Sequence, residues 1–229
     1  MDGSKVNWKT GAVTDSSGKG NTGFVVGTST PMSTSTAPVI GKIGQALKFD
    51  GGDDYILVKT SALISPTSAL TVSAWVKTSL SSDNQHIYSE NNSANGHLTH
   101  QVTILSTGKV VYDTYTPSGG SLATTASVNN GIWHHVAVSR MTDNTTALYI
   151  DGVMDTSGSV SDYDGGLSVD AVSIGRRHNN VTPTQDDYFN GFIDEVRIYN
   201  RALSAVEVSA LYNSGAAKLN VSPTKYLTN

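Results

Sequence analysis

An oxygen-rich turn near the amino end is the first place where residue types and spacing could do chemistry. Asp15 and Asn21 bracket a glycine-interrupted segment whose polar residues recur at alternate positions, so their side-chain oxygens can converge with a backbone carbonyl. Ca²⁺ accepts irregularly placed oxygen ligands of this kind. The alternative is that Asp15 and Asn21 only cap the turn, and the positive charge of Lys19 in its middle disfavours a cation.

A carboxylate within an apolar strand is the second candidate. Residues 192–199 alternate as a strand does, which predicts that Asp194 shares a face with the aliphatic Val196 and Ile198. Burying a carboxylate is costly unless backbone donors, a cation or a metal ion compensates for the lost solvation. Asp194 therefore needs a partner from elsewhere in the chain.

A second acidic turn contains Asp50, Asp53 and Asp54. The same oxygen chemistry could apply to it, but carboxylates at a hairpin tip are common without an ion. We favour a solvated hairpin tip at this position.

The histidines and carboxylates give no catalytic pattern. His134 and His135 are adjacent in a strand and lack the spacing of a zinc motif, so a structural role is expected for both, whereas His100 could line a groove. Asp194 and Glu195 are neighbours and point to opposite faces, so they cannot act as a carboxylate pair. The sequence contains neither a nucleophile elbow nor a phosphate-binding glycine loop, and we expect no enzymatic activity.

Polar loops between the strands are the candidate recognition surface. Sugar binding needs amide and carboxylate groups for hydroxyls and an aromatic ring for the C–H face of the sugar, and loops around 91–97, 112–115, 176–180 and 186–188 offer these types. Such loops also occur without any ligand. The predicted ligand-binding residues are Asn95, His97, Tyr115, Arg177, His178 and Asp187.

The elements that would position these residues are mostly strands. Short alternating segments separated by Gly, Asn, Asp and Ser predict an all-β protein, and Asp151-Gly152 is a strong two-residue hairpin signal. The predicted strands are 46–50, 54–59, 69–77, 86–90, 98–105, 109–115, 133–140, 146–150, 171–175 and 192–199.

One helix is expected after the last strand. Ser204 and Glu207 have the spacing of a capping box, and a helix of about two turns should begin there and end near Gly215. The polar segment 216–229 has the composition of a linker, so we divide the chain into a domain, 1–215, and a tail, 216–229.

The composition of the chain excludes several classes of function. The chain of 229 residues has a formal charge of −4 and no cluster of basic residues, which disfavours binding to nucleic acid or to an anionic membrane. Without cysteine it can form neither a disulfide nor a thiolate metal site. No segment has the length and apolarity of a membrane span or signal sequence, so membrane insertion is not expected.

Five motifs occur in order between about Thr14 and Gly215, namely 45–58, Ser73-Ala-Trp-Val76, 133–138, Leu148-Tyr-Ile-Asp-Gly152 and Ile193-Asp-Glu-Val-Arg-Ile-Tyr199. Together they resemble the laminin-G-like jelly-roll family of the concanavalin-A-like lectin and glucanase folds. The resemblance implies a two-sheet antiparallel jelly-roll sandwich. It also implies an aromatic first strand before the 15–23 turn. No such strand is expected here, so that a neighbouring strand would be left with an unpaired edge.

The resemblance also implies a site. Related jelly rolls hold a structural calcium between the amino-terminal turn and the last strand, which here would be Ca²⁺ bound by Asp15, Asn21 and Asp194. The paired acidic residues of related glucanases have no counterpart, and Val172-Ser-Ile-Gly175 replaces the acidic cluster with which pentraxin-like relatives bind ligand.

Three functions are compatible with this sequence. The first is a non-catalytic recognition module of a larger extracellular, bacterial surface or secreted protein, which binds carbohydrate or a surface glycoconjugate or mediates adhesion beside neighbouring domains. The second is a repeated structural unit of a surface stalk without a ligand of its own. The third is an accessory domain of a glycan-active enzyme.

Overall fold

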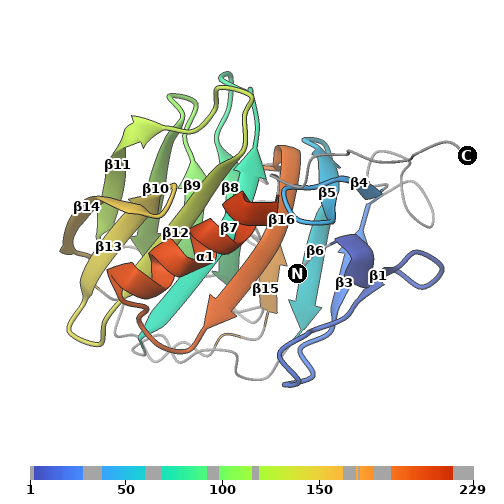
Figure 1. Cartoon of the computed structure of the whole chain (residues 1–229), viewed down its shortest axis with the longest axis horizontal. Coiled ribbons are helices and arrows are strands. Elements are labelled where there is room, and N and C mark those ends of the chain that lie inside the picture. Colours follow the sequence, from blue (N-terminus) through green and yellow to red (C-terminus); the bar gives the residue numbers. More distant parts are fainter. Residues whose placement is uncertain are drawn as a thin grey trace, which may run out of the picture.

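The fold is a sandwich of two antiparallel sheets, seen in a computed structural model (Figure 1). The all-β jelly-roll class predicted from the sequence is confirmed. The structure describes residues 3–27, 38–59, 69–91, 98–114, 119–161, 169, 171–177 and 187–218.

Within these residues one sheet has nine strands and the other has seven. In spatial order, the nine-stranded sheet contains β1 (Val6–Asn7), β2 (Ala12–Val13), β3 (Gly23–Val26), β6 (Tyr55–Lys59), β15 (Ala171–Ile174), β8 (Gln85–Asn91), β9 (Leu98–Ile104), β10 (Lys109–Thr114) and β11 (Ser121–Ser127). The seven-stranded sheet contains β14 (Val153–Ser159), β13 (Thr145–Ile150), β12 (His134–Arg140), β7 (Leu70–Lys77), β16 (Asn190–Tyr199), β5 (Gln45–Asp50) and β4 (Pro38–Ile40). A short 3-10 helix, η1 (Gly3–Lys5), precedes β1, and α1 (Ala205–Lys218) follows β16.

The core fills the space between the inner faces of the two sheets. Alternate residues of β7, namely Val72, Ala74 and Val76, meet Val102 and Tyr112 from the opposite sheet in one apolar cluster. Because strand side chains alternate, the remaining residues of the same strands face outward. The nine-stranded sheet therefore has a second, polar face on the side away from the core.

The sequence prediction missed the polar strands β11 and β14, as well as the short strands β1 to β4. β11 and β14 are rich in Ser and Thr and lack the apolar alternation that predicts a strand. They are joined by Asp155, whose carboxylate accepts hydrogen bonds from the backbone N–H groups of Thr125 (2.6 Å) and Ala126 (3.0 Å) and from the Thr125 hydroxyl. This Asp155 clasp links the edge strands of the two sheets.

The expected unpaired edge at the amino end is wrong. β1 and β2 form a short antiparallel hairpin, with Val6 opposite Val13, and β2 pairs with β3. Gly11 has a φ of 74°, the left-handed conformation that this tight reversal requires. The sequence also allows residues 218–221 to fold back and fill such a gap, and these residues lie mostly outside the described part of the chain.

A β-bulge in β16 overturns the predicted faces of this strand. Glu195 has a φ of 49°, and the pairing with β7 shifts register between Asp194 and Arg197. Consequently Ile193 and Val196 both reach the core, whereas Asp194 pairs with Trp75 on the outer side. Asp194 does not share a face with Val196, because the extra residue of the bulge inverts the alternation.

The helix begins as predicted. The Glu207 carboxylate accepts a hydrogen bond from the Ser204 backbone N–H (2.9 Å), and the Ser204 hydroxyl accepts one from the Glu207 N–H (3.4 Å). The predicted length of about two turns and the predicted end near Gly215 are wrong, since α1 has 14 residues and continues to Lys218. A Cβ at position 215 would lie 2.5 Å from Trp75 Nε1, so this glycine permits close packing of the helix on the sheet rather than ending it.

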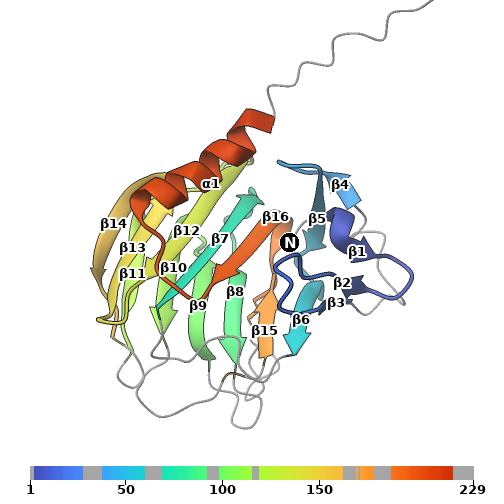
Figure 2. The same cartoon turned by 60° about the horizontal axis from the view of Figure 1, so that its bottom comes forward.

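Helix α1 covers the outer face of the seven-stranded sheet (Figure 2). Tyr212 stacks on Trp75 with ring centroids 5.4 Å apart, and the His135 ring lies 5.3 Å from Trp75 and 6.2 Å from Tyr212. Burial lowers the pKa of the His135 imidazole to about 4, and the charge of Asp151 offsets this only in part. The neutral imidazole is therefore part of the helix–sheet contact.

Replacing His135 should change how stability depends on pH. The unfolded chain takes up this proton near pH 6.5, whereas the folded chain does so only near pH 4. The free energy of unfolding should fall as the pH drops through this window, by up to roughly 3 kcal/mol from this group. We expect His135→Phe to remove that part of the slope in urea unfolding between pH 7 and 4. Parallel curves for the two proteins would contradict this.

Candidate functional site

Of the predicted ligand-binding residues, Arg177 and Asp187 lie together. The Arg177 N–H donates to the Asp187 carbonyl (3.2 Å), and Arg176 forms a β-bridge with Tyr188. We call residues 176–177 and 187–188 the crossing ribbon. Asn95, His97, Tyr115 and His178 lie outside the described residues.

A row of polar side chains crosses the outer face of the nine-stranded sheet. Strand register places Ser173 opposite Ser89, Ser89 opposite Gln101, and Gln101 opposite Asp113. The row alternates with core residues such as Val102, which confirms that it faces away from the core. Four neighbouring strands thus supply hydroxyl, amide and carboxylate groups on one surface.

Asp113 and Arg177 form the charged end of this row. Burial raises the pKa of Asp113 to about 6, although the positive charge of Arg177 acts to lower it. Gln101 Nε2 lies 3.5 Å from Asp113 Oδ2. The Nε atom of Arg177 is buried without a hydrogen-bond partner, so this guanidinium is not fully engaged within the protein.

The crossing ribbon is anchored to strand β8. The Ser89 hydroxyl donates to the Arg176 carbonyl (2.8 Å), and His86 Nε2 lies 3.5 Å from Asp187 Oδ2. His86 Nδ1 lies 3.1 Å from the Thr103 hydroxyl. A hydroxyl, an imidazole and a carboxylate in line also occur in hydrolases, but Thr103 is only 6% exposed, so we interpret this trio as an anchor.

Two aromatic rings lie beside Arg176, one from the ribbon itself and one from strand β6. The Arg176 guanidinium carbon lies 4.1 Å from the centroid of the Tyr55 ring and 5.9 Å from that of Tyr188. The two tyrosine centroids are 6.4 Å apart. This cation–π arrangement stiffens Arg176 and leaves the half-buried rings at the surface.

His100, predicted to line a groove, lies instead inside the sandwich. It is 1% exposed, and its Nδ1 lies 2.7 Å from the Tyr112 hydroxyl. His134 is held between Asp151 Oδ2 (2.8 Å) and Asn130 Oδ1 (3.1 Å), in agreement with a structural role. The Nδ1 atom of His135, in contrast, is buried without a hydrogen-bond partner.

The residues of the predicted calcium site have other partners. Asp15 accepts hydrogen bonds from the backbone N–H groups of Ser17 (2.8 Å) and Asn21 (3.1 Å). Partial burial acts to raise the pKa of Asp15, but these hydrogen bonds hold it below its ordinary value. This is the turn-capping arrangement that the sequence allowed as the alternative.

Asp194 is 1% exposed, and backbone N–H groups donate hydrogen bonds to its carboxylate. Its Oδ2 accepts from the Ile43 N–H (2.9 Å) and its Oδ1 from the Glu195 N–H (2.8 Å). The backbone N–H donors around both carboxylates fit hydrogen bonding better than a shared ion. Calcium bound by Asp15, Asn21 and Asp194 stays a prediction.

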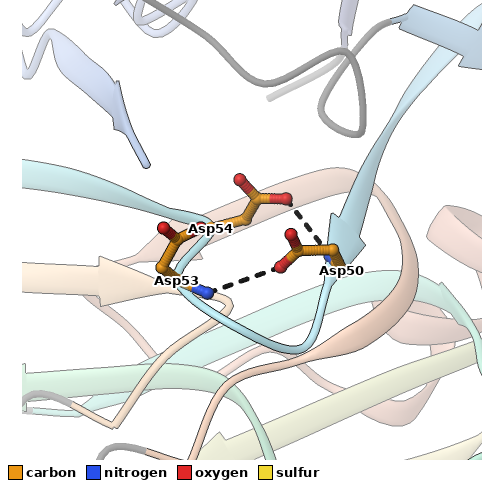
Figure 3. Close-up of side chains that lie close together, drawn as sticks. All are labelled: Asp50, Asp53 and Asp54. Atoms are coloured by element: carbon orange, nitrogen blue, oxygen red, sulfur yellow. Dashed lines mark hydrogen bonds between the residues drawn. The ribbon is translucent and has the colours of Figure 1, made fainter. Parts of the chain in front are cut away.

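The acidic turn between β5 and β6 brings three carboxylates together (Figure 3). Oxygens of Asp50, Asp53 and Asp54 lie within 4.8 Å of one another, the only group of three potential metal ligands within the described residues. The expected solvated tip is wrong for Asp54, which is 0% exposed, and its Oδ2 accepts from the Asp50 N–H (3.2 Å). Carboxylates at this separation can share a cation, and they also serve as acceptors for the turn's own backbone.

Sequence reasoning missed most of the site described above. The sequence pattern identifies Gln101 and Asp113 only as residues of predicted strands. It identifies His86 and Ser89 only as part of a short strand. The available signal was the polar residue at every second position of neighbouring strands. Their register, which brings the four strands into one row, was not readable from the sequence.

A cavity of about 10 Å³ lies on the opposite sheet, beneath α1, lined in part by Trp75, His135 and Arg197. Such a volume holds about one water molecule and cannot admit a sugar. The surface around Asp113 and Arg177 is therefore the better candidate.

Removing the charge of Asp194 should destabilise the fold. In Asp194→Asn, an amide nitrogen must face one of two backbone donors, which should lower the free energy of unfolding by about 2–3 kcal/mol. Asp143→Asn, at an exposed turn, is the matched control and should cost much less. Urea unfolding measures both, and equal losses in the two variants would contradict this account of Asp194.

Comparison with known proteins places the chain in a family. The family described as the concanavalin A-like lectin/glucanases superfamily matches residues 50–209. No curated protein matches the chain. Among the described residues, no helix has the length and apolarity needed to cross a membrane.

Solved structures share the fold at low sequence identity. The binding domain of Paraclostridial Mosquitocidal Protein 1 is 22% identical, with a TM-score of 0.66 over 88% of this chain and 49% of that chain. The ligand-binding domain of botulinum neurotoxin serotype D, in complex with N-acetylneuraminic acid, is 19% identical, with a TM-score of 0.65 over 89% and 48%. The chain spans about half the length of these toxin domains.

A third structure is matched over nearly all of its length. Domain 4 of AbnA, a GH43 extracellular arabinanase from Geobacillus stearothermophilus, in complex with arabinotriose, is 24% identical, with a TM-score of 0.65 over 86% of this chain and 91% of that domain. These likenesses establish the fold, and the family match covers well over half of the sequence. The chain belongs to the concanavalin A-like lectin/glucanase superfamily.

Proposed function

We propose that this protein is a non-catalytic carbohydrate-binding module of a larger extracellular protein. The observation that carries the proposal is the pair of half-buried charged groups, Asp113 and Arg177, at the edge of a polar row on a rigid sheet, with Gln101 Nε2 3.5 Å from Asp113 Oδ2. Binding residues held by packed strands keep their geometry without a ligand, which lowers the entropic cost of recognition.

The chemistry of this group suits sugar hydroxyls. A carboxylate accepts hydrogen bonds from hydroxyls, and a guanidinium donates to their oxygens. Asp113 and Arg177 are half-buried, so their hydrogen bonds to a ligand are less weakened by water than those of fully exposed groups. The rings of Tyr55 and Tyr188, beside Arg176, could pack against the C–H face of a sugar.

Similar structures support a binding role without naming the sugar. Domain 4 of the arabinanase holds arabinotriose, and the serotype D neurotoxin domain holds N-acetylneuraminic acid. One is a neutral sugar chain and the other an acidic sugar, so the same architecture accommodates different ligands.

A second candidate function is that of an accessory domain in a glycan-active enzyme. The arabinanase domain favours it, because the present chain covers nearly all of that domain. Sugar binding is common to both candidates. A structural stalk unit remains the alternative if no glycan binds.

Variants of the charged pair test the proposal. A glycan array identifies the ligand, and isothermal titration then compares wild type with Arg177→Ala and Asp113→Asn. Each variant should lose at least about tenfold in affinity, because each removes a charge-assisted hydrogen bond. Arg201→Ala and Asp83→Asn, outside the site, are matched controls and should bind as wild type does. Unchanged binding by both site variants would reject this location.

The affinity should also depend on pH. The pKa of Asp113 is about 6, and its ionised form is the stronger acceptor for hydroxyls, so affinity should fall as the pH drops from 7 to 5. Titrations at several pH values should show a loss approaching about tenfold per pH unit below 6. Asp113→Asn should bind weakly with a flat profile, and a pH dependence retained in this variant would show that another group is responsible.

Calcium is a separate proposal that rests on the sequence and on the family resemblance. An ion held by Asp15, Asn21 and Asp194 in the native state must raise the midpoint of thermal unfolding, and excess chelator must lower it. Asp15→Asn should abolish that response, whereas Asp53→Asn should leave it intact. A midpoint that calcium and chelator do not move would leave these carboxylates as acceptors for backbone N–H groups.

A further inference from the structure

We propose that the site recognises the end of a glycan chain rather than its interior. This inference rests on the proposed carbohydrate binding at Asp113 and Arg177 and specifies which part of the glycan is bound. It follows from the way in which the crossing ribbon divides the outer face of the nine-stranded sheet.

The ribbon lies across the middle of the polar row. Its Arg176 carbonyl is tied to Ser89, and its Asp187 carboxylate lies beside His86, so both of its segments are held against β8. The two segments are themselves joined through the Arg177 N–H and the Asp187 carbonyl. The ribbon is therefore part of the folded scaffold and not a loose flap.

The centre of the polar row is buried. Ser173 is 1% exposed, Ser89 is 0% exposed and Gln101 is 5% exposed, whereas Asp113 and Arg177 remain half-buried. A glycan lying across several strands would need accessible groups at every strand, because neighbouring strands are about 4.8 Å apart, which is roughly the length of one sugar unit. The covered centre of the row interrupts that path.

The chemistry of a chain end fits the accessible groups. In an interior unit, one hydroxyl oxygen is used in the linkage to the next sugar, whereas the terminal unit keeps it as a free donor and acceptor. Asp113 can accept from one hydroxyl while Arg177 donates to a neighbouring one. A terminal unit can thus satisfy both residues with its free end directed at the ribbon and the remaining chain leading away into solvent.

Affinity as a function of chain length tests this. Isothermal titration of the full chain uses arabinan, xylan and β-glucan fragments from monosaccharide to hexasaccharide, together with sialyllactose. For a series that binds, affinity should stop rising by the disaccharide, with less than about threefold gain to the hexasaccharide. An increase of about tenfold or more from disaccharide to hexasaccharide would overturn chain-end recognition while leaving carbohydrate binding intact.

A second measurement counts binding sites on the polymer. Cutting the bound polysaccharide with an endo-acting enzyme creates new ends, so the number of protein molecules bound per unit mass should rise with the number of cuts. A constant or falling number would overturn the inference. Arg177→Ala should abolish binding to the cut polymer. Phe24 lies at the far end of the same face of the sheet and is 51% exposed, and Phe24→Ala should leave binding unchanged.

Failure of carbohydrate binding and failure of chain-end recognition give different results. If wild-type protein binds none of these probes, the proposed function fails and the inference falls with it. If it binds with an affinity that grows along the series, or if Phe24→Ala weakens binding to the long fragments, only chain-end recognition is rejected.

Discussion

A buried carboxylate that accepts two backbone N–H groups is the interaction on which the last strand depends. The Asp194 carboxylate accepts hydrogen bonds from the backbone N–H groups of Ile43 and Glu195. These bonds compensate the buried charge of Asp194 and give a backbone donor of the irregular bulge an acceptor. The bulge lets β16 contribute Ile193 and Val196 to the core and still present Asp194 to the outer side. Strand β16 directly follows residues 187–188, so the position of β16 also fixes this half of the crossing ribbon.

Much of the fold was predictable because it depends on local signals. The alternation in 70–77 and 134–140, the Asp151-Gly152 turn and the capping box at Ser204 each specify their element without reference to distant residues. The faces of β16 and the extent of α1 were not predictable in this way. The faces of β16 depend on a bulge in which Asp194 accepts a hydrogen bond from the distant Ile43 N–H. The extent of α1 depends on Gly215, which allows the helix to pack closely against Trp75.

The candidate site shows the same division. Arg177 and Asp187 could be selected from the sequence because polar loop residues stand out, and the structure brings the two together. Asp113 and Gln101 could not, because their significance arises only when the register aligns β9 with β10 and burial shifts the pKa of a carboxyl group. A strand contributes to a site through its neighbours, and neighbours are a property of topology rather than of spacing.

The Asp155 clasp has a consequence for the behaviour of the protein in solution. Edge strands expose unpaired backbone groups that can recruit a strand from another molecule and begin aggregation. At this end of the sandwich, the carboxylate on β14 occupies two N–H groups of β11, the edge strand of the facing sheet. Strand β11 is thereby made a poorer template for intermolecular pairing at the two positions that the clasp occupies.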